Sequence, residues 1–215
     1  VGGSHRPGPP INCAAMVEPR IPPGTRRDLR RIDWWIVRML GRATGGGPPN
    51  VFTTLARHRR LFRPWLWFAG RLMPGGLLPR AETELLILRV AHLCGSGYEW
   101  TQHERIALSA GLTEADVRRV REGPEAPGWS ERQELLLRAA DELHATRTLS
   151  DELWERLRPQ MSDAELIELC MLVGHYEMLA MTLNALAVQP DRLPPGPPPR
   201  AVRLGQRLLG PRRRR

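Results

Sequence analysis

Cysteine is scarce in this chain, and its placement excludes two classes of protein. The three cysteines, Cys13, Cys94 and Cys170, are widely spaced, with no C-x-x-C pair and no even set. A disulfide framework needs paired cysteines, and a structural zinc site read from sequence needs closely spaced ligands. We therefore expect no disulfide and no metal, and a reducing cytoplasm as the location.

Lysine is absent, and all 32 basic residues are arginine, which we take to reflect genome composition more than mechanism. The net charge of +9 is unevenly distributed, because residues 191–215 hold eight arginines and one aspartate. The preceding part of the chain is close to neutral, so it gives little reason to expect a nucleic-acid surface.

A secretory signal is also lacking, because the short apolar run INCAAMV follows glycines and prolines. The most apolar late segment, 165–188, carries Glu168, His175, Glu177 and Asn184. Charged residues are rare inside membrane spans, so this segment is predicted to be a buried helix, and no membrane partner is expected.

Strand-like alternation and repeats of 20 to 50 residues are both missing, whereas helical periodicity recurs between Pro and Gly breaks. The pattern predicts an all-α, compact multi-helix bundle. Expected helices cover residues 25–41, 51–62, 63–73, 80–93, 96–110, 113–123, 130–147, 150–158 and 162–188. The expected domains are a flexible leader or cloning remnant at 1–24, one helical domain at 25–190, and a Pro/Arg-rich tail at 191–215.

Capping signals mark several helix starts. Ser130 with Gln133, and Ser162 with Glu165, have the spacing of a capping box, in which each side chain bonds the other residue's backbone N–H. The stretch SGYEWTQH, 96–103, has the same spacing at Ser96 and Glu99. It raises a second interpretation, because Glu99 and His103 lie four residues apart on one helix face.

A candidate catalytic set joins this helix to the preceding one. Glu84 shares an inward stripe with apolar residues, and a short connection makes the two helices antiparallel neighbours, so Glu84 can reach His103. A buried Glu–His pair can move a proton near neutral pH. Two alternatives stay open: Glu84 as a surface pair with Arg80, and His103 as an ordinary core histidine.

The segment RAETELLILRVAHLCGSGYEWTQHERIALSAGLT resembles the core motif of the carboxymuconolactone decarboxylase family, which includes alkylhydroperoxidase D. The resemblance extends over about 80–190 and implies a compact all-α fold assembled as trimers or hexamers. The peroxidase branch carries E…C-x-x-C-x-x-x-H. Aligned on His103, its glutamate falls at Glu84, but its cysteines fall at Ser96 and Glu99, and Cys94 lies two residues too early.

The decarboxylase branch instead has a glutamate four residues before the histidine, as at Glu99 and His103. The resemblance thus implies a cofactor-free acid–base enzyme of the carboxymuconolactone decarboxylase type, a lyase or isomerase, acting on a small carboxylated or lactone-like metabolite. The expected catalytic residues are His103, Glu84 and Glu99, and the expected substrate-binding residues are Tyr98, Trp100, Ser96 and His175. Two alternatives remain: an antioxidant peroxidase, and a non-catalytic binding protein that uses the arginine-rich tail.

Partner predictions follow from the same observations. A homo-oligomer is expected because four tryptophans lie on short N-terminal helices that are too small to bury them, Trp34, Trp35, Trp65 and Trp67. A small-molecule substrate is expected. Binding to nucleic acid or to a membrane is not expected.

Overall fold

A computed structural model describes residues 18–44 and 46–191. The described part of the chain is helical and contains no strand, which confirms the all-α prediction. The elements are α1 (Arg31–Thr44), α2 (Asn50–Leu55), α3 (Phe62–Leu72), α4 (Arg80–Leu93), α5 (Gly97–Ala110), α6 (Glu114–Glu122), α7 (Glu131–Thr146), α8 (Asp151–Leu157), a 3-10 turn (Arg158–Gln160) and α9 (Asp163–Ala185).

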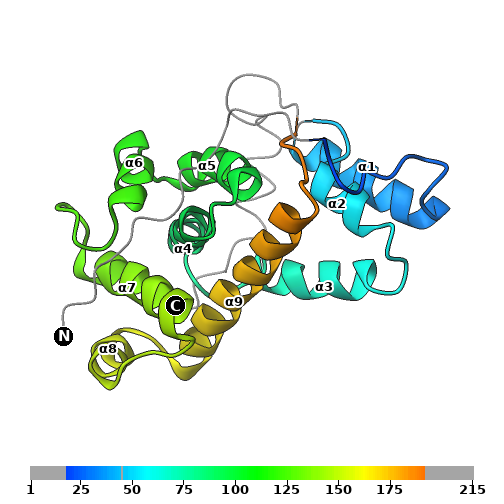
Figure 1. Cartoon of the computed structure of the whole chain (residues 1–215). Coiled ribbons are helices and arrows are strands. Elements are labelled where there is room, and N and C mark those ends of the chain that lie inside the picture. Colours follow the sequence, from blue (N-terminus) through cyan, green and yellow to red (C-terminus); the bar gives the residue numbers. More distant parts are fainter. Residues whose placement is uncertain (1–17, 45, 192–215) are drawn as a thin grey trace.

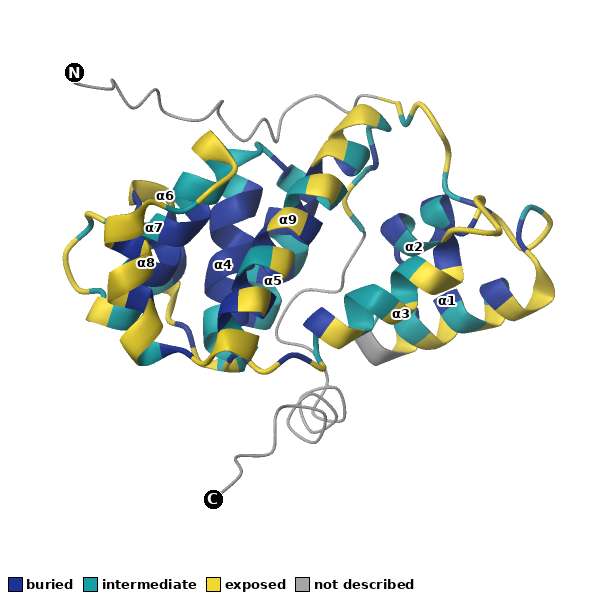
Figure 2. Cartoon of the chain, turned by 90° about the horizontal axis from the view of Figure 1, so that it is seen from below, coloured by how far each residue is buried: buried dark blue, intermediate teal, exposed yellow. Residues whose placement is uncertain are grey.

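Helix α4 is the centre of the domain and contacts α5, α6, α7 and α9 (Figures 1 and 2). Its residues 83–91 are all buried, including the charged Glu84 and Arg89. Arg89 is satisfied by two hydrogen bonds to the Asp141 carboxylate, at 2.6 and 2.7 Å, and one to the Val120 carbonyl, at 2.8 Å. A helix apolar nearly all round needs neighbours on every side, and the fold supplies them.

The N-terminal helices α1, α2 and α3 form a separate packing unit on the other side of α9 (Figure 1). Their own cluster is built around Val37, Ala56 and Phe62. The predicted helix 51–62 was wrong in one respect, because it ends at Leu55 and α3 begins at Phe62. In the turn between them, the Leu61 backbone N–H donates to the His58 carbonyl at 3.0 Å and also to the His58 Nδ1 atom at 3.1 Å, so the His58 side chain reinforces the turn.

Helix α9 is long and apolar enough to cross a membrane, with a mean hydropathy of 1.4. Half of that window is buried inside the domain, where α9 packs against α3, α4 and α7. The expected assignment as a core helix agrees with this packing. The domain boundaries at residues 24 and 190 remain predictions, since most of both terminal segments lies outside the described residues.

Three capping boxes form as the sequence indicates, at Thr113/Asp116, Ser130/Gln133 and Ser162/Glu165, and Ser150 caps α8. The predicted box at Ser96/Glu99 was wrong. Ser96 occupies the N-cap of α5 but makes no side-chain cap hydrogen bond. Both residues are buried in the core, Ser96 at 0% and Glu99 at 2% exposure.

Candidate functional site

The turn between α4 and α5 sets the geometry of the site. Gly95 has a φ of 60°, a left-handed conformation that glycine adopts without steric cost. The Ser96 N–H then donates to the Ala91 carbonyl at 2.8 Å and closes the end of α4. The chain reverses within three residues, so α4 and α5 pack side by side, as the antiparallel prediction requires.

Glu84 and His103 meet across these two helices. The His103 Nδ1 atom lies 2.7 Å from the Glu84 Oε2 atom, and Glu84 is fully buried while His103 is 7% exposed. The Arg80 guanidinium pairs with the other oxygen, Oε1, at 2.8 Å. Glu84 therefore pairs with both Arg80 and His103, but the pair with Arg80 is not the surface pair of the first alternative, because the Glu84 side chain is fully buried.

This arrangement fixes the orientation of the imidazole. A carboxylate oxygen accepts hydrogen bonds, so the tautomer that satisfies this contact carries its proton on Nδ1 of His103. The second ring nitrogen, Nε2, is then left as the one that can accept a proton. A carboxylate holding one nitrogen of a histidine in this way sets its tautomer and stabilises the imidazolium form.

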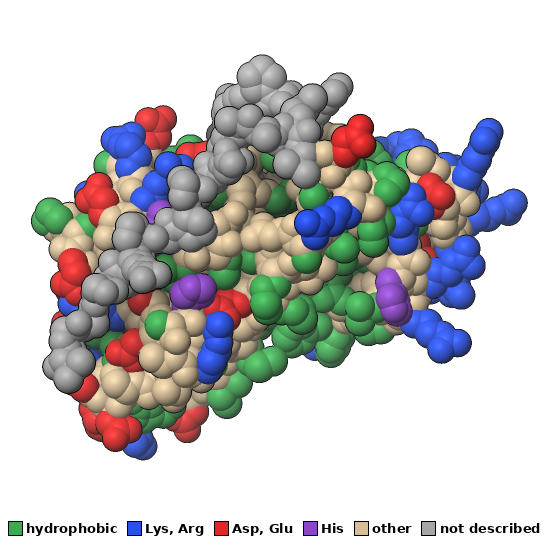
Figure 3. Space-filling view, in the orientation of Figure 1, with side chains coloured by type: hydrophobic (Ala, Val, Ile, Leu, Met, Phe, Trp, Pro, Cys, Tyr) green, Lys and Arg blue, Asp and Glu red, His purple; other side chains and the backbone are tan. Residues whose placement is uncertain are grey.

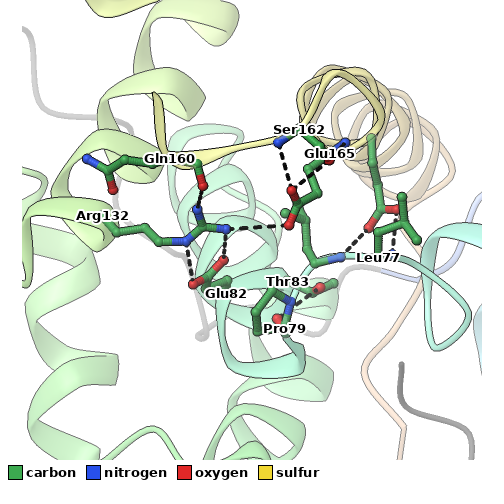
Figure 4. A network of polar contacts seen from close by, with 10 residues as sticks. Leu77, Pro79, Glu82, Thr83, Arg132, Gln160, Ser162 and Glu165 are labelled. Atoms are coloured by element: carbon green, nitrogen blue, oxygen red, sulfur yellow. Dashed lines mark hydrogen bonds and ion pairs between the residues drawn. The ribbon is translucent and has the colours of Figure 1, made fainter. Parts of the chain in front are cut away.

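The start of α4, which carries Arg80, is anchored by a polar network on α7 and α9 (Figure 4). Arg132 donates to both oxygens of Glu82, at 2.8 and 2.9 Å, and to the Gln160 carbonyl. Glu168 accepts from the backbone N–H groups of Leu77 and Leu78, at 2.6 and 3.0 Å. These bonds hold the first turn of α4 rigid, which is what a positioned catalytic group needs.

Glu99 is the most unusual group in the site. Neither of its carboxylate oxygens has a hydrogen-bond partner among the described residues. Burial raises its pKa to about 8, although the neighbouring Ser96 hydroxyl acts in the opposite direction. Desolvation penalises the charged form, so Glu99 is protonated at neutral pH and can donate a proton.

Tyr176 of α9 lies close enough to Glu84 and Glu99 for their charges to act on its hydroxyl. Burial raises its pKa well above the ordinary value, and the negative charges of Glu84 and Glu99 raise it further, whereas Arg80 lowers it. Its ring meets the His103 ring edge-on, with centroids 5.2 Å apart. Tyr176 therefore belongs to the same group of side chains, although the predicted site did not include it. The adjacent positions His175 and Tyr176, inside a long apolar helix, were the available signal.

His175 packs among aromatic rings. It stacks on Trp65 with centroids 6.1 Å apart and meets Phe68 edge-on at 5.4 Å and Tyr176 at 5.3 Å. Burial lowers its pKa to about 4, so it is neutral at pH 7. Its Nδ1 atom has no hydrogen-bond partner in the described chain. The rings of Trp65, His175 and Tyr176 thus form a continuous line from α3 to His103.

Two of the predicted substrate-binding residues point elsewhere. The Tyr98 hydroxyl donates to Asp191 at 2.8 Å and accepts from the Val51 N–H at 3.2 Å. Trp100 packs in a second core cluster, with the Arg121 guanidinium 4.2 Å from its ring centroid. Tyr98 holds the end of the described chain against α2, and Trp100 packs with residues of α6. Their predicted role in substrate binding remains a prediction.

Cys94, the cysteine nearest the site, is partly buried directly after α4. Burial raises the pKa of its thiol to about 12, and the charges of Glu177 and Glu99 act in the same direction. A thiol that stays protonated is a poor nucleophile, because the thiolate is the reactive form. The structure therefore gives Cys94 the environment of an unreactive thiol.

Comparisons with known proteins agree with the fold. Residues 59–142 match the model of the Carboxymuconolactone decarboxylase family. No curated protein matches the chain. Similar solved structures include the alkylhydroperoxidase AhpD core of an uncharacterized peroxidase-related protein from Ralstonia eutropha JMP134, at 19% identity and a TM-score of 0.74, covering 83% of this chain and 95% of that one.

Two further structures have the same fold, and their names refer to two different reactions. An uncharacterized peroxidase-related protein from Silicibacter sp. TM1040 is 17% identical, with a TM-score of 0.72 over 83% of this chain and 96% of that one. The debrominase Bmp8 is 16% identical, with a TM-score of 0.64 over 88% of this chain and 97% of that one. At these identities the likeness establishes the fold and leaves the reaction open.

Proposed function

We propose that the protein is an acid–base enzyme of the carboxymuconolactone decarboxylase family, because residues 59–142 match the model of that family and the fold is similar to that of the AhpD core. Its substrate is a small carboxylated or lactone-like metabolite, and its reaction is a decarboxylation or an isomerisation. The observation that carries the proposal is the Glu84–His103 contact of 2.7 Å beside the unpartnered, protonated Glu99.

The roles of the three residues follow from their surroundings. His103 uses Nε2 to take a proton from the substrate carbon or to return one to it, while Glu84 and Arg80 keep its ring in place. Glu99, one helical turn away on α5, supplies a proton as general acid. Positioned acid–base groups of this kind contribute about 10²- to 10⁴-fold in rate. The proposal assigns no step to a metal or organic cofactor.

His103→Ala tests the proposal. A panel of small lactones and carboxylates is screened for loss of carbon dioxide or for a change in ultraviolet absorption, and the active compound is followed with the variant. We expect kcat to fall by about 10²- to 10⁴-fold with the helical content unchanged. The matched control is His58→Gln, in the turn before α3, which should keep full activity. Near-normal turnover by His103→Ala would refute the assignment.

The pH profile provides an independent test of Glu99. A general acid must be protonated, so turnover should fall as the pH rises through about 8, the pKa of Glu99. Glu99→Gln should lower turnover and also remove this alkaline limb. An unchanged limb in the variant would assign it to another group.

An antioxidant peroxidase is the second candidate, favoured by the two peroxidase-related structural neighbours. It needs a reactive thiolate, and the pKa of Cys94, about 12, opposes that chemistry. Peroxide consumption that disappears in Cys94→Ser would support this candidate over the acid–base enzyme. Consumption that does not depend on cysteine would remove it.

A homo-oligomer is proposed as the working assembly. Exposed apolar side chains follow one face of α9, at Ile167, Met171, Met178 and Met181, with exposures of 44 to 66%. Hydrophobic side chains gather on the face formed by α9 and α3 (Figure 3), and Trp67 of α3 is 67% exposed. Large contiguous apolar patches on the surface of a globular protein mark sites of interaction with other molecules.

The test is the molar mass in solution, measured by light scattering during size exclusion. Met178→Glu combined with Met181→Glu should convert a trimer or hexamer into smaller species. The control, Trp154→Glu, changes a hydrophobic residue on α8, outside this face, and should leave the mass unchanged. A monomeric wild-type chain would refute the proposal.

A further inference from the structure

Three side chains from different helices converge beyond the end of α4. Cys94 follows α4 directly, His144 lies in the last turn of α7, and Glu177 lies on α9. The Cys94 Sγ atom is 3.9 Å from the His144 Nδ1 atom, which is 2.7 Å from the Glu177 Oε1 atom. All three ligand-type atoms lie within 4.8 Å of one another.

These separations are near those around one tetrahedral ion. Zinc bonds of about 2.3 Å to sulfur and about 2.0 to 2.2 Å to nitrogen and oxygen place neighbouring ligand atoms about 3.3 to 3.6 Å apart. The sulfur–nitrogen distance of 3.9 Å is about 0.3 Å too long, and the nitrogen–oxygen distance of 2.7 Å is about 0.6 Å too short, so His144 and Glu177 must move apart to admit the ion. We propose that Cys94, His144 and Glu177 bind a zinc ion with three protein ligands and a fourth position open to solvent.

The donor set selects the metal. One thiolate, one imidazole and one carboxylate match the mixed sulfur, nitrogen and oxygen ligands of zinc, whereas magnesium and calcium prefer oxygen alone. The open position follows from exposure, because the side chain of His144 is 32% exposed and that of Glu177 is 13% exposed. Water therefore reaches the ion and completes the coordination.

Neighbouring groups already hold the ligands in place. The Arg147 guanidinium donates to the Glu177 Oε2 atom at 2.6 Å, which leaves Oε1 directed at His144. The Asn184 side chain donates to the Cys94 backbone carbonyl at 2.9 Å and fixes the turn that carries the thiol. Contacts of this kind orient metal ligands before the ion arrives and are a large part of a site's affinity.

The Glu177 carboxylate places negative charge at the candidate site, which suits a cation. A divalent ion displaces the thiol proton and binds the thiolate. Zinc binding should therefore release protons and link α4, α7 and α9, the three helices that surround the candidate site.

The experiment measures zinc on the full-length chain without an affinity tag, since a histidine tag would itself bind the metal. After incubation with zinc and exhaustive dialysis, we expect one zinc per chain by elemental analysis. Substitution with cobalt should give the near-ultraviolet absorption of a thiolate–cobalt bond. Loss of an orienting contact alone weakens binding about 10- to 100-fold, so Cys94→Ser and His144→Gln should each weaken it by more than about 100-fold.

The matched control carries Cys13→Ser and Cys170→Ser, which leaves Cys94 as the sole cysteine. It should keep the stoichiometry, the affinity and the cobalt absorption. A wild-type chain that retains no zinc overturns the proposal, and so does a folded Cys94→Ser variant that binds as tightly as wild type. Circular dichroism confirms folding of each variant. Because the readout is bound metal, either result leaves the acid–base proposal at His103 separately testable.

Discussion

Glu99→Gln should change how stability depends on pH. The Glu99 carboxyl is 2% exposed and has no hydrogen-bond partner among the described residues. Its pKa is about 8 in the folded protein, against an ordinary value of 4.5. The folded state therefore holds this proton more tightly than the unfolded chain does. Between pH 4.5 and 8 each rise in pH favours unfolding, and below pH 4.5 the penalty is absent.

The size of the effect follows from the shift. One pKa unit corresponds to about 1.4 kcal/mol, so a difference of 3.5 units between the two values amounts to about 5 kcal/mol above pH 8. This is an upper limit, because water entering near an ionised Glu99 would reduce its desolvation. Glutamine keeps the shape and cannot ionise, so the variant lacks the penalty.

His175 acts in the opposite direction at lower pH. Its pKa is lowered from 6.5 to about 4, so the unfolded chain binds the proton more readily between these values. Stability from this group is complete above pH 6.5 and is lost as the pH falls toward 4. The two effects oppose each other from pH 4.5 to 6.5. From pH 6.5 to 8 Glu99 acts without this opposition and lowers stability by about 2 kcal/mol.

Urea denaturation at intervals from pH 5 to 9 measures the unfolding free energy of the wild type and of Glu99→Gln. The difference in unfolding free energy between Glu99→Gln and wild type should grow by about 1.4 kcal/mol per pH unit up to pH 8 and then level off. The control, Glu114→Gln, removes an exposed carboxylate on α6 and should give a flat difference. A flat difference for Glu99→Gln as well would refute the raised pKa, and with it the role of Glu99 as an acid.

Three further predictions are tested by urea denaturation. Arg89→Met removes the partner of Asp141 and should cost about 3 to 5 kcal/mol, and a loss below about 1 kcal/mol would contradict the pairing. Ser130→Ala removes a formed cap and should cost about 1 kcal/mol, and an unchanged stability would contradict the cap. His175→Phe should stabilise the protein by up to about 3 kcal/mol at pH 4 relative to wild type, and an equal acid sensitivity in both would contradict its lowered pKa.

Helix starts were predictable where the cap residue stays at the surface. Ser130 and Ser162 are exposed, so nothing competes with their local hydrogen bonds and the sequence spacing alone decides. Ser96 has the same spacing, but Ser96 and Glu99 are both buried, and Ser96 makes no side-chain cap hydrogen bond. The failed capping prediction thus marks the position where the fold places an ionisable group in the core.

The contact between Glu84 and His103 was predictable because it depends on two local features, an inward helical stripe and a short reversal. The other residues that surround this pair were less predictable. Tyr176 reaches His103 from α9, and Asp191 occupies the Tyr98 hydroxyl from beyond α9. Both contacts join segments far apart in the chain, and their register depends on crossing angles that no periodicity contains.

The proposed zinc ligands were even less predictable from the sequence. Sequence reasoning looked for closely spaced cysteines and histidines and therefore expected no metal. Cys94 and His144 are 50 residues apart, His144 and Glu177 are 33 residues apart, and the packing of three helices brings them together. Nothing in the spacing of such a set distinguishes it from scattered residues, so only the packed structure identifies it.

Arg80 connects the two interpretations that the sequence left open for Glu84. A guanidinium paired with a buried carboxylate is what an ordinary ion pair requires, and it is also what a base needs behind it. The Arg80 Nη2 atom lies 2.8 Å from Oε1 and the His103 Nδ1 atom lies 2.7 Å from Oε2, so each oxygen of the buried carboxylate faces one partner. With Oε1 turned to Arg80, Oε2 holds the imidazole, and in the proposed mechanism Nε2 is the nitrogen that reacts. The ion pair is thus a condition of the proposed chemistry and not an alternative to it.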